Sequence, residues 1–118
     1  MTLQKFIRAA QQGPVAFTET MKMIELYFDY VPAGFYNGIG DQLFFNEACT
    51  NEGSCKLFAF ARFNDLDEQA TLNCFGDYYA VDVLQNPEGK DHQNIRTFIQ
   101  CGWKGIIFDS LPLTLKTP

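Results

Sequence analysis

Apolar side chains recur at helical spacing over the first part of the chain. Four of them share one face of a short predicted helix: Leu3, Phe6, Ile7 and Ala10. Thr2 is the expected N-cap of this helix, and Gly13-Pro14 ends it. The same spacing predicts a second helix over residues 15–30, which Pro32 closes. The chain is therefore expected to begin with two amphipathic helices.

Residues 34–45 change to a pattern rich in aromatic side chains and glycine. This pattern predicts two short strands around a turn, and Asn37-Gly38 favours the turn because both residue types tolerate a positive φ. Residues 106–108 predict a further strand, and the alternation of Leu111, Leu113 and Leu115 predicts an edge segment. We expect the ribbon at 34–45 and the C-terminal segment to form a small antiparallel sheet.

The segment at 54–64 is a predicted helix with almost no polar face. Its apolar members are Cys55, Leu57, Phe58, Ala59, Phe60, Ala61 and Phe63. A helix that is apolar on nearly all sides is typical of the centre of a protein, where its neighbours cover it. Asn51 or Ser54 is the expected cap of this helix.

Two further helical segments follow. Asp65 or Asp67 is expected to cap a helix over residues 68–75, which Gly76 interrupts and residues 77–84 restart. After a turn at 86–89, Asp91 is expected to cap a helix over residues 92–101, with Gly102 as its stop. The inner face of this last helix is expected to hold Ile95, Phe98 and Ile99.

These elements predict an α+β fold that is mainly α. About five helices surround the central apolar helix, together with a small antiparallel β-sheet. The length of 118 residues and the absence of a linker-like tract predict a single domain over 1–118. The 12 Phe, 5 Tyr and one Trp supply enough large side chains for a core without a disulfide or metal.

The charge balance excludes some classes of binding partner. Nine Lys and Arg against 14 Asp and Glu give a formal net charge of −5, which argues against nucleic acid or an anionic membrane as partner. The sequence has no export signal and no apolar run of membrane-spanning length. It also has no nucleotide-binding glycine motif, and we expect no cofactor. A protein partner or a homo-oligomer remains open.

The four cysteines, Cys49, Cys55, Cys74 and Cys101, are not spaced like a zinc or redox motif. Reduced and mostly buried thiols are therefore expected, and no metal site. Cys49 and Cys55 lie close in sequence, and the spacing leaves open whether they can pair.

A catalytic interpretation rests on Cys55, His92 and Asp91. Cys55 lies near the start of the central helix, where the helix dipole lowers a thiol pKa, and His92 is the only histidine. The simpler interpretation makes Asp91 a helix cap, leaves His92 facing solvent or bonded to a loop, and buries Cys55 like an alanine. Further polar residues that a shared cleft would gather are Glu52, Asp77, Tyr78 and Arg96.

The ribbon offers a second candidate surface. Its aromatic members Phe35, Tyr36, Phe44 and Phe45 alternate along the predicted strands, so some of them face outward unless helices cover both faces. An exposed apolar patch of this kind is typical of a surface that binds another protein.

Several short blocks carry a family resemblance: Asn51-Glu52-Gly53-Ser54-Cys55-Lys56, Phe58-Ala59-Phe60-Ala61, Cys74-Phe75-Gly76-Asp77-Tyr78-Tyr79, Asn86-Pro87-Glu88-Gly89, Asp91-His92-Gln93-Asn94-Ile95-Arg96 and Gly102-Trp103. In this order they resemble the HopJ type III effector family. The resemblance implies a bacterial protein, located in the cytoplasm or delivered into a host cell by a type III secretion system. It brings no catalytic motif to carry over.

We therefore expect a HopJ-like protein-interaction module with no established molecular activity. Two alternatives stay open: a small hydrolase-like enzyme that uses Cys55 and His92, and an intracellular housekeeping protein unrelated to secretion.

Overall fold

The computed structural model describes residues 1–117. The elements follow one another as α1 (Leu3–Gln12), α2 (Phe17–Tyr27), β1 (Phe28–Tyr30), β2 (Phe35–Asn37), the 3₁₀ turn η1 (Gly40–Gln42), β3 (Phe44–Asn46), α3 (Glu52–Phe63), α4 (Glu68–Asn73), the π-helix η2 (Tyr78–Val83), α5 (Gln93–Cys101), the 3₁₀ turn η3 (Gly102–Gly105), β4 (Ile107–Phe108) and β5 (Leu113–Leu115). The predicted fold class, α+β and mainly α, is confirmed.

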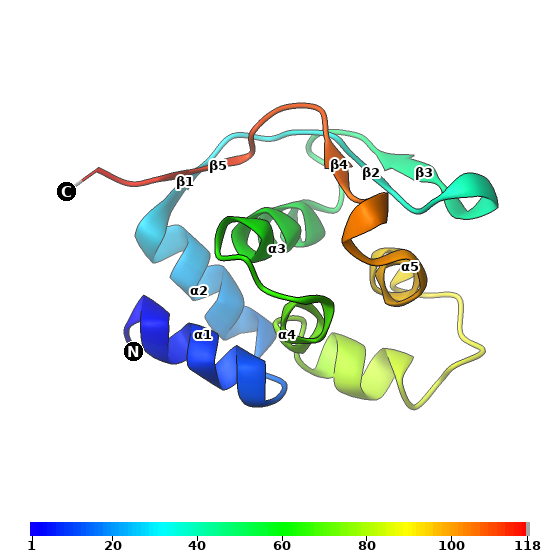
Figure 1. The fold of residues 1–118 in the computed structure, drawn as a ribbon, viewed down its shortest axis with the longest axis horizontal. Helices are drawn as coiled ribbons and strands as arrows, with labels where there is room; N and C mark the ends of the chain where they lie inside the picture. Colours follow the sequence, from blue (N-terminus) through cyan, green and yellow to red (C-terminus); the bar gives the residue numbers. More distant parts are fainter. Residues whose placement is uncertain (118) are drawn as a thin grey trace.

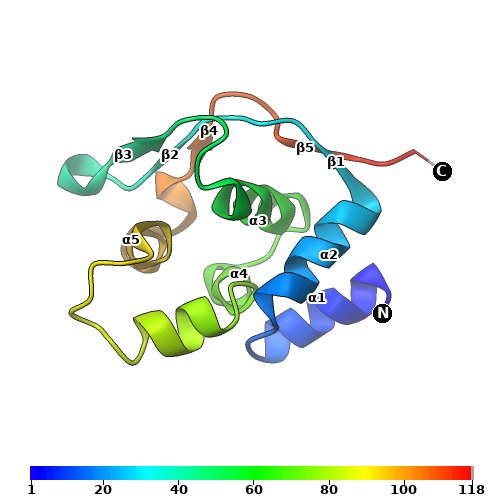
Figure 2. The ribbon, with the colours of Figure 1, turned by 180° about the vertical axis from the view of Figure 1, so that it is seen from behind.

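Helix α3 lies in the middle of the molecule, with the strands on one side and α4 on the other (Figures 1 and 2). Nearly all of its apolar side chains are buried, as the sequence predicts. Phe58 is the centre of an aromatic cluster whose other members lie on β2, on η3, on α5 and beyond α4. Its ring lies 4.9–6.2 Å, centroid to centroid, from those of Phe35, Phe75, Phe98 and Trp103. The aromatic core therefore joins most of the chain to α3.

The strands form two small antiparallel sheets. In the three-stranded sheet the order is β3-β2-β4, and in the two-stranded sheet β1 pairs with β5. The expected pairing of the 34–45 ribbon with the C-terminal segment is confirmed by β2 and β4. Leu113–Leu115, however, pairs with a strand that the sequence did not predict.

That strand is β1, and it corrects the predicted end of the second helix. The helix ends at Tyr27, and Phe28 to Tyr30 is extended instead of helical. Phe28 is buried, as the helical prediction required, but it lies in a strand opposite Leu115 of β5. Cross-strand hydrogen bonds outweigh the local helical preference here.

The turn between β2 and β3 is also different from the prediction. Asn37 is the buried last residue of β2 and has no positive φ, whereas Gly38 and Gly40 in the connection do, with φ 107° and 61°. The chain then passes through η1 before β3 begins. A Cβ on Gly38 would lie 2.3 Å from the carbonyl oxygen of Gln42, so the connection needs glycine at this position.

The predicted caps hold for the first and fourth helices. The Thr2 side chain accepts a hydrogen bond from the Lys5 N–H, and that of Asp67 from the Ala70 N–H. In α5, Ile95 and Phe98 are buried as expected, whereas Ile99 is 43% exposed and does not belong to the inner face.

Replacing Phe58 by Ala is expected to destabilise the protein by about 3–5 kcal/mol, because it removes a side chain that four aromatic rings surround. Urea unfolding measures the free energy of unfolding. Leu111→Ala is the control: that side chain is 71% exposed, and its loss should cost about 0.5 kcal/mol or less. Equal losses in the two variants would contradict the central role of Phe58.

Candidate functional site

A cavity of about 350 Å³ lies where the first turns of α3 and α5 meet. Its lining residues are Phe17, Phe44, Asn51, Gly53, Ser54, Phe75, Tyr78, His92, Gln93, Asn94 and Ile95. We call it the His92 cavity. Phe17, Phe44, Phe75 and Tyr78 supply its aromatic walls, and its other polar side chains lie at the starts of α3 and α5, a composition typical of small-molecule sites.

The helices α3 and α5 begin in the same unusual way. Each follows a residue in the left-handed conformation, Asn51 with φ 47° and His92 with φ 51°. Asparagine and histidine are among the non-glycine residues that tolerate this conformation best. Neither side chain caps its helix. The prediction that Asp91 caps the last helix is therefore wrong: His92 occupies the N-cap position.

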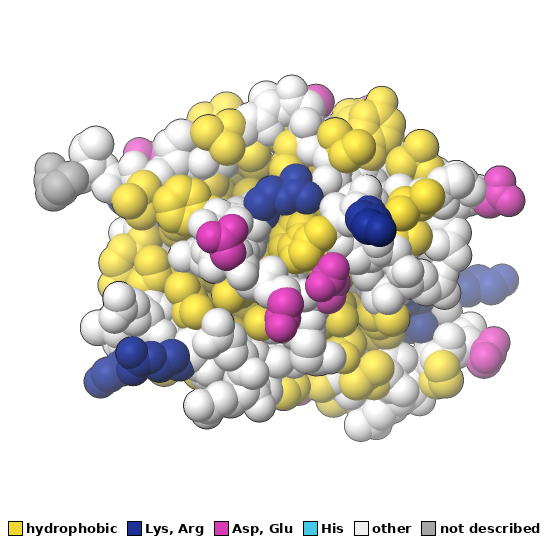
Figure 3. Space-filling model, in the orientation of Figure 1, with side chains coloured by type: hydrophobic (Ala, Val, Ile, Leu, Met, Phe, Trp, Pro, Cys, Tyr) yellow, Lys and Arg dark blue, Asp and Glu magenta, His cyan; other side chains and the backbone are white. Residues whose placement is uncertain are grey.

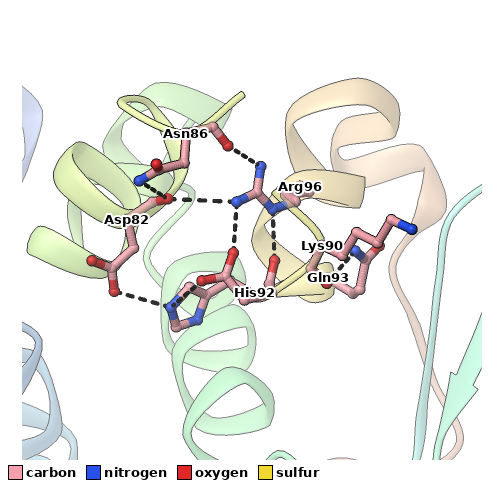
Figure 4. A network of polar contacts seen from close by, with 7 residues as sticks. Asp82, Asn86, Lys90, His92, Gln93 and Arg96 are labelled. Carbon is pink, nitrogen blue, oxygen red and sulfur yellow. Dashed lines mark hydrogen bonds and ion pairs between the residues drawn. The ribbon is translucent and has the colours of Figure 1, made fainter. Parts of the chain in front are cut away.

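The His92 imidazole contacts two carboxylates and one aromatic ring, and Figure 4 shows the contacts with the carboxylates. Its Nε2 lies 3.1 Å from a carboxylate oxygen of Asp82 and 3.8 Å from one of Asp91. The Tyr78 ring packs against the imidazole, 5.2 Å between centroids. Because a carboxylate only accepts hydrogen bonds, Nε2 carries the hydrogen, which leaves Nδ1 with the lone pair in neutral imidazole.

Arg96 ties the loop before α5 to the rest of the structure (Figure 4). Its guanidinium donates to the Asp91 carboxylate at 2.6 Å, to the Asp91 carbonyl at 2.6 Å and to the Asn86 carbonyl at 2.9 Å. Gly89 makes room for it, since a Cβ there would lie 2.5 Å from Nη2. The side chain is only 12% exposed, so this clamp fixes both ends of the loop that carries His92.

Three buried asparagines hold α5 against the β2–β3 hairpin. The Asn37 amide donates to the carbonyl and to the side chain of Asn94, and Asn46 and Asn94 exchange hydrogen bonds through their side chains. Asn51 donates to Asn46 at 2.7 Å and adds the start of α3 to the cluster. Sequence reasoning missed the role of Asn37 and Asn46, because no local pattern marks a distant partner.

Cys55 does not join His92. Its side chain is 1% exposed, its Sγ donates to the Ala33 carbonyl, and it is not among the residues that line the His92 cavity. Burial raises the pKa of the Cys55 thiol, which opposes the thiolate that a nucleophile needs. Cys49 is exposed, and all four cysteines of the described chain are free thiols.

The other predicted polar residues are divided among different places. Tyr78 lines the His92 cavity, and Arg96 reaches the loop beside it. Asp77 lines a separate hollow against Pro14 and Gly76. Glu52 begins α3 but does not line the His92 cavity. Among the described residues, no three His, Cys, Asp or Glu side chains are placed to share a metal ion.

A second groove, of about 620 Å³, lies between the η1–β3 connection, the end of η2 and the outer face of α5. Leu43, Leu84 and Ile99 supply part of its apolar surface, and Gln42, Gln93 and Gln100 supply amide groups. It shares Phe44 and Gln93 with the His92 cavity.

Comparison with known proteins places this geometry in a family. The family model described as HopJ type III effector protein matches residues 3–113. The chain belongs to the HopJ family. The crystal structure of VPA0580, a protein of unknown function, is 48% identical and superposes with a TM-score of 0.90, covering 98% of this chain and 95% of that one. No curated protein matches.

The HopJ resemblance predicted from the sequence is thus confirmed. The comparisons associate the family with type III secretion by name and supply no molecular activity. Within the described residues, none of the helices has the length and apolar character needed to cross a membrane.

The Asp91–Arg96 contact should make stability depend on pH. The Arg96 hydrogen bond holds the pKa of the Asp91 carboxyl below its ordinary value. The contact therefore contributes fully to stability above the pKa that the Asp91 carboxyl has in the unfolded chain. This contribution is lost as the pH falls through the pKa of Asp91 in the folded protein. The difference in unfolding free energy between the unmodified chain and Asp91→Asn should shrink as the pH falls from 7 to 2.5, followed by urea unfolding.

Arg96→Gln provides the matched background for this measurement. In that background, adding Asp91→Asn should produce a smaller pH-dependent difference, because the guanidinium that contributes most to the lowered pKa of the carboxyl has gone. A pH dependence of equal size in both backgrounds would assign the effect to another group.

Thiol reactivity should follow burial. Burial raises the pKa of Cys55 and raises that of Cys74 to about 12, whereas Cys49 is exposed. Iodoacetamide at pH 8 should therefore modify Cys49 long before Cys55 and Cys74, as read by peptide mass spectrometry. All three should react at similar rates in denaturant. Fast labelling of native Cys55 would restore it as a candidate nucleophile.

Proposed function

We propose that this HopJ-family chain is a protein-interaction module that binds a partner through the outer face of its three-stranded sheet. The supporting observation is a row of three exposed apolar side chains across that face. In the strand register, Tyr36 of β2 lies opposite Phe45 of β3 and Ile107 of β4. They are 42%, 42% and 58% exposed. We call this row the outer strip.

The alternation along the strands sorts the predicted partner residues. Tyr36 and Phe45 belong to the outer strip, and their rings are 4.8 Å apart. Phe35 is fully buried against Phe58 and is not available to a partner. Phe44 is half-buried on the inner side, where it lines the His92 cavity.

Local packing keeps the outer strip in place without burying it. The Phe45 ring covers Gly34, where a Cβ would lie 2.4 Å from its Cζ. Glycine therefore lets the ring lie close to the β2 backbone. Ile39 and Leu43, each 51% exposed, continue the apolar surface onto the connection between β2 and β3. Figure 3 shows hydrophobic side chains along the upper edge, where the strands run in Figure 1.

The charges around the outer strip favour one kind of partner. Glu47 directly follows β3 and Asp109 directly follows β4, both exposed. The Asp109 carboxylate lies beside the Phe45 ring, because both meet the position of a Cβ on Gly34. With a net charge of −5, the chain fits an apolar surface that basic residues border. A second copy would bring the same acidic residues face to face, which disfavours a homodimer here.

The place of action is part of the proposal. The family name supports delivery into a host cell by a type III system, from a bacterial cytoplasm in which the protein is made. A basic-bordered partner of host origin fits that role. A bacterial partner fits the alternative of an intracellular housekeeping protein. The Cys55–His92 enzyme has lost its support, because Cys55 is buried outside the His92 cavity.

Site-specific photocrosslinking tests the outer strip. A benzophenone amino acid at position 45 or 107 should capture the same partner, whereas position 26 in α2 should not, although Leu26 is 57% exposed. Unmodified protein should compete for the adduct, and a chain with Phe45→Ser and Ile107→Ser should not. High salt should weaken capture, because the charged border contributes.

Three outcomes would overturn the proposal. They are adducts that form equally from position 26, adducts only between copies of this chain, and adducts that the doubly substituted chain competes for as well as the unmodified one.

A further inference from the structure

We propose that Ser54, His92 and Asp82 form a site for acyl transfer in the His92 cavity, with small carboxylic esters as the substrate class. This function goes beyond the proposed protein interaction, because it uses the inner side of the hairpin and none of the outer strip. It rests on a paired histidine, an unpaired hydroxyl and two helix N-termini around one cavity.

Ser54 supplies the nucleophile. It is the third residue of α3, it lines the cavity, and within residues 1–117 its hydroxyl makes no hydrogen bond and is not enclosed. Adjacent residues of a helix point about 100° apart, so the neighbouring Cys55 turns into the core while Ser54 faces the cavity. The chain thus presents a hydroxyl where the sequence suggested a thiol.

His92 supplies the base. Asp82 accepts the hydrogen of Nε2 at 3.1 Å, which fixes the tautomer and leaves the lone pair on Nδ1. Within the described chain Nδ1 makes no hydrogen bond, and the imidazole forms part of the cavity wall. Tyr78 packs against the ring and limits its rotation. Asp82 is a positioning residue in this scheme, since it acts through His92.

The helix ends supply an electrostatic environment for a developing oxyanion. The first backbone hydrogen bond of α3 is donated by Cys55, and that of α5 by Ile95. The N–H groups of Gly53, Ser54, Gln93 and Asn94 precede these and are not used by the helices. They belong to residues that line the cavity. Uncommitted N–H groups at the positive end of a helix dipole stabilise negative charge.

The chemistry is a two-step acyl transfer. The Ser54 Oγ–H proton passes to Nδ1 of His92 while Oγ bonds to the ester carbonyl carbon and the C=O electron pair moves to oxygen. Collapse of this intermediate breaks the bond to the alcohol, which takes the proton from Nδ1. Water then attacks the acyl-serine with the same proton transfers, which releases the carboxylic acid and regenerates Ser54. No oxidant, metal or other co-reactant takes part.

The walls define the acyl group. Phe17, Phe44, Phe75 and Ile95 surround the polar end, and Gly53 lets the Phe17 ring approach α3, since a Cβ there would lie 2.8 Å from its Cζ. A cavity of about 350 Å³ lined in this way fits a small aromatic or branched acyl group. Benzoate esters should therefore be preferred to long-chain esters.

Acylation by p-nitrophenyl benzoate tests the site. The test uses a Cys49→Ala chain, because Cys49 is an exposed thiol that such esters also modify. Release of p-nitrophenolate gives the rate, and peptide mass spectrometry locates the benzoyl group on Ser54. Ser54→Ala should abolish that adduct, and His92→Gln should slow acylation by about 10²-fold or more. Ser110→Ala, at an exposed serine outside the cavity, is the matched control and should react normally.

The role of Asp82 is tested by kinetic effects that a loss of structure alone would not produce. Asp82→Asn should lower the acylation rate with little change in the KM for the ester, and Asp82→Glu should restore part of the rate. Circular dichroism and thermal melts establish that the variants fold.

Two results would overturn the proposal. One is a benzoyl group found only on lysines or the N-terminus, at a rate that Ser54→Ala and His92→Gln leave unchanged. The other is no adduct on folded, unmodified Ser54. Neither result bears on the outer strip, which is tested by crosslinking.

Discussion

The way in which the β2–β3 hairpin meets α5 depends on hydrogen bonds among buried asparagine side chains. Asn37, Asn46 and Asn94 are nearly or fully buried, and their side chains bond to one another across β2, β3 and α5. A shift of α5 by one residue would break several of these bonds at once and leave buried N–H groups unpaired, which costs free energy. The Asn37 Oδ1 is the one atom of these three amides that is buried without a partner among the described residues. Asn51 extends the same network to α3. The cluster therefore connects the starts of α3 and α5 where they line the His92 cavity.

Much of the fold could be predicted from local sequence patterns. The stripe of Leu3, Phe6 and Ala10, the cap at Asp67 and the apolar α3 depend on neighbours within a few residues, and all are present. Strand β1 could not be predicted in this way, because Phe28 continues the helical spacing of α2 and its strand partner, Leu115, is near the other end of the chain. Tertiary pairing decides such segments.

In the candidate site, too, some features could be predicted from local sequence patterns and others depend on tertiary contacts. Its segments were visible as blocks around Ser54 and His92, but the role of each residue depended on register. Asp91 has the side chain of a helix cap, yet it pairs with Arg96, and His92 takes the N-cap position with a left-handed backbone. Arg96 reaches the Asp91 and Asn86 carbonyls, and Gly89 leaves space for its guanidinium. No sequence pattern predicts these hydrogen bonds of Arg96, because they form only when the folded loop brings Asn86 and Asp91 together.

The alternation of side chains along a strand places the two proposed functions on opposite faces of the hairpin. Successive side chains of β3 point to opposite faces, so Phe45 lies on the outer strip while Phe44 lines the His92 cavity. Phe44 stands opposite Asn37, a member of the amide cluster, and Phe45 stands opposite Tyr36. The register that forms the hydrogen bonds of the amide cluster therefore also fixes which aromatic rings remain on the surface. A slip of one residue would bury the outer strip and expose the amides together, so one constraint maintains both surfaces.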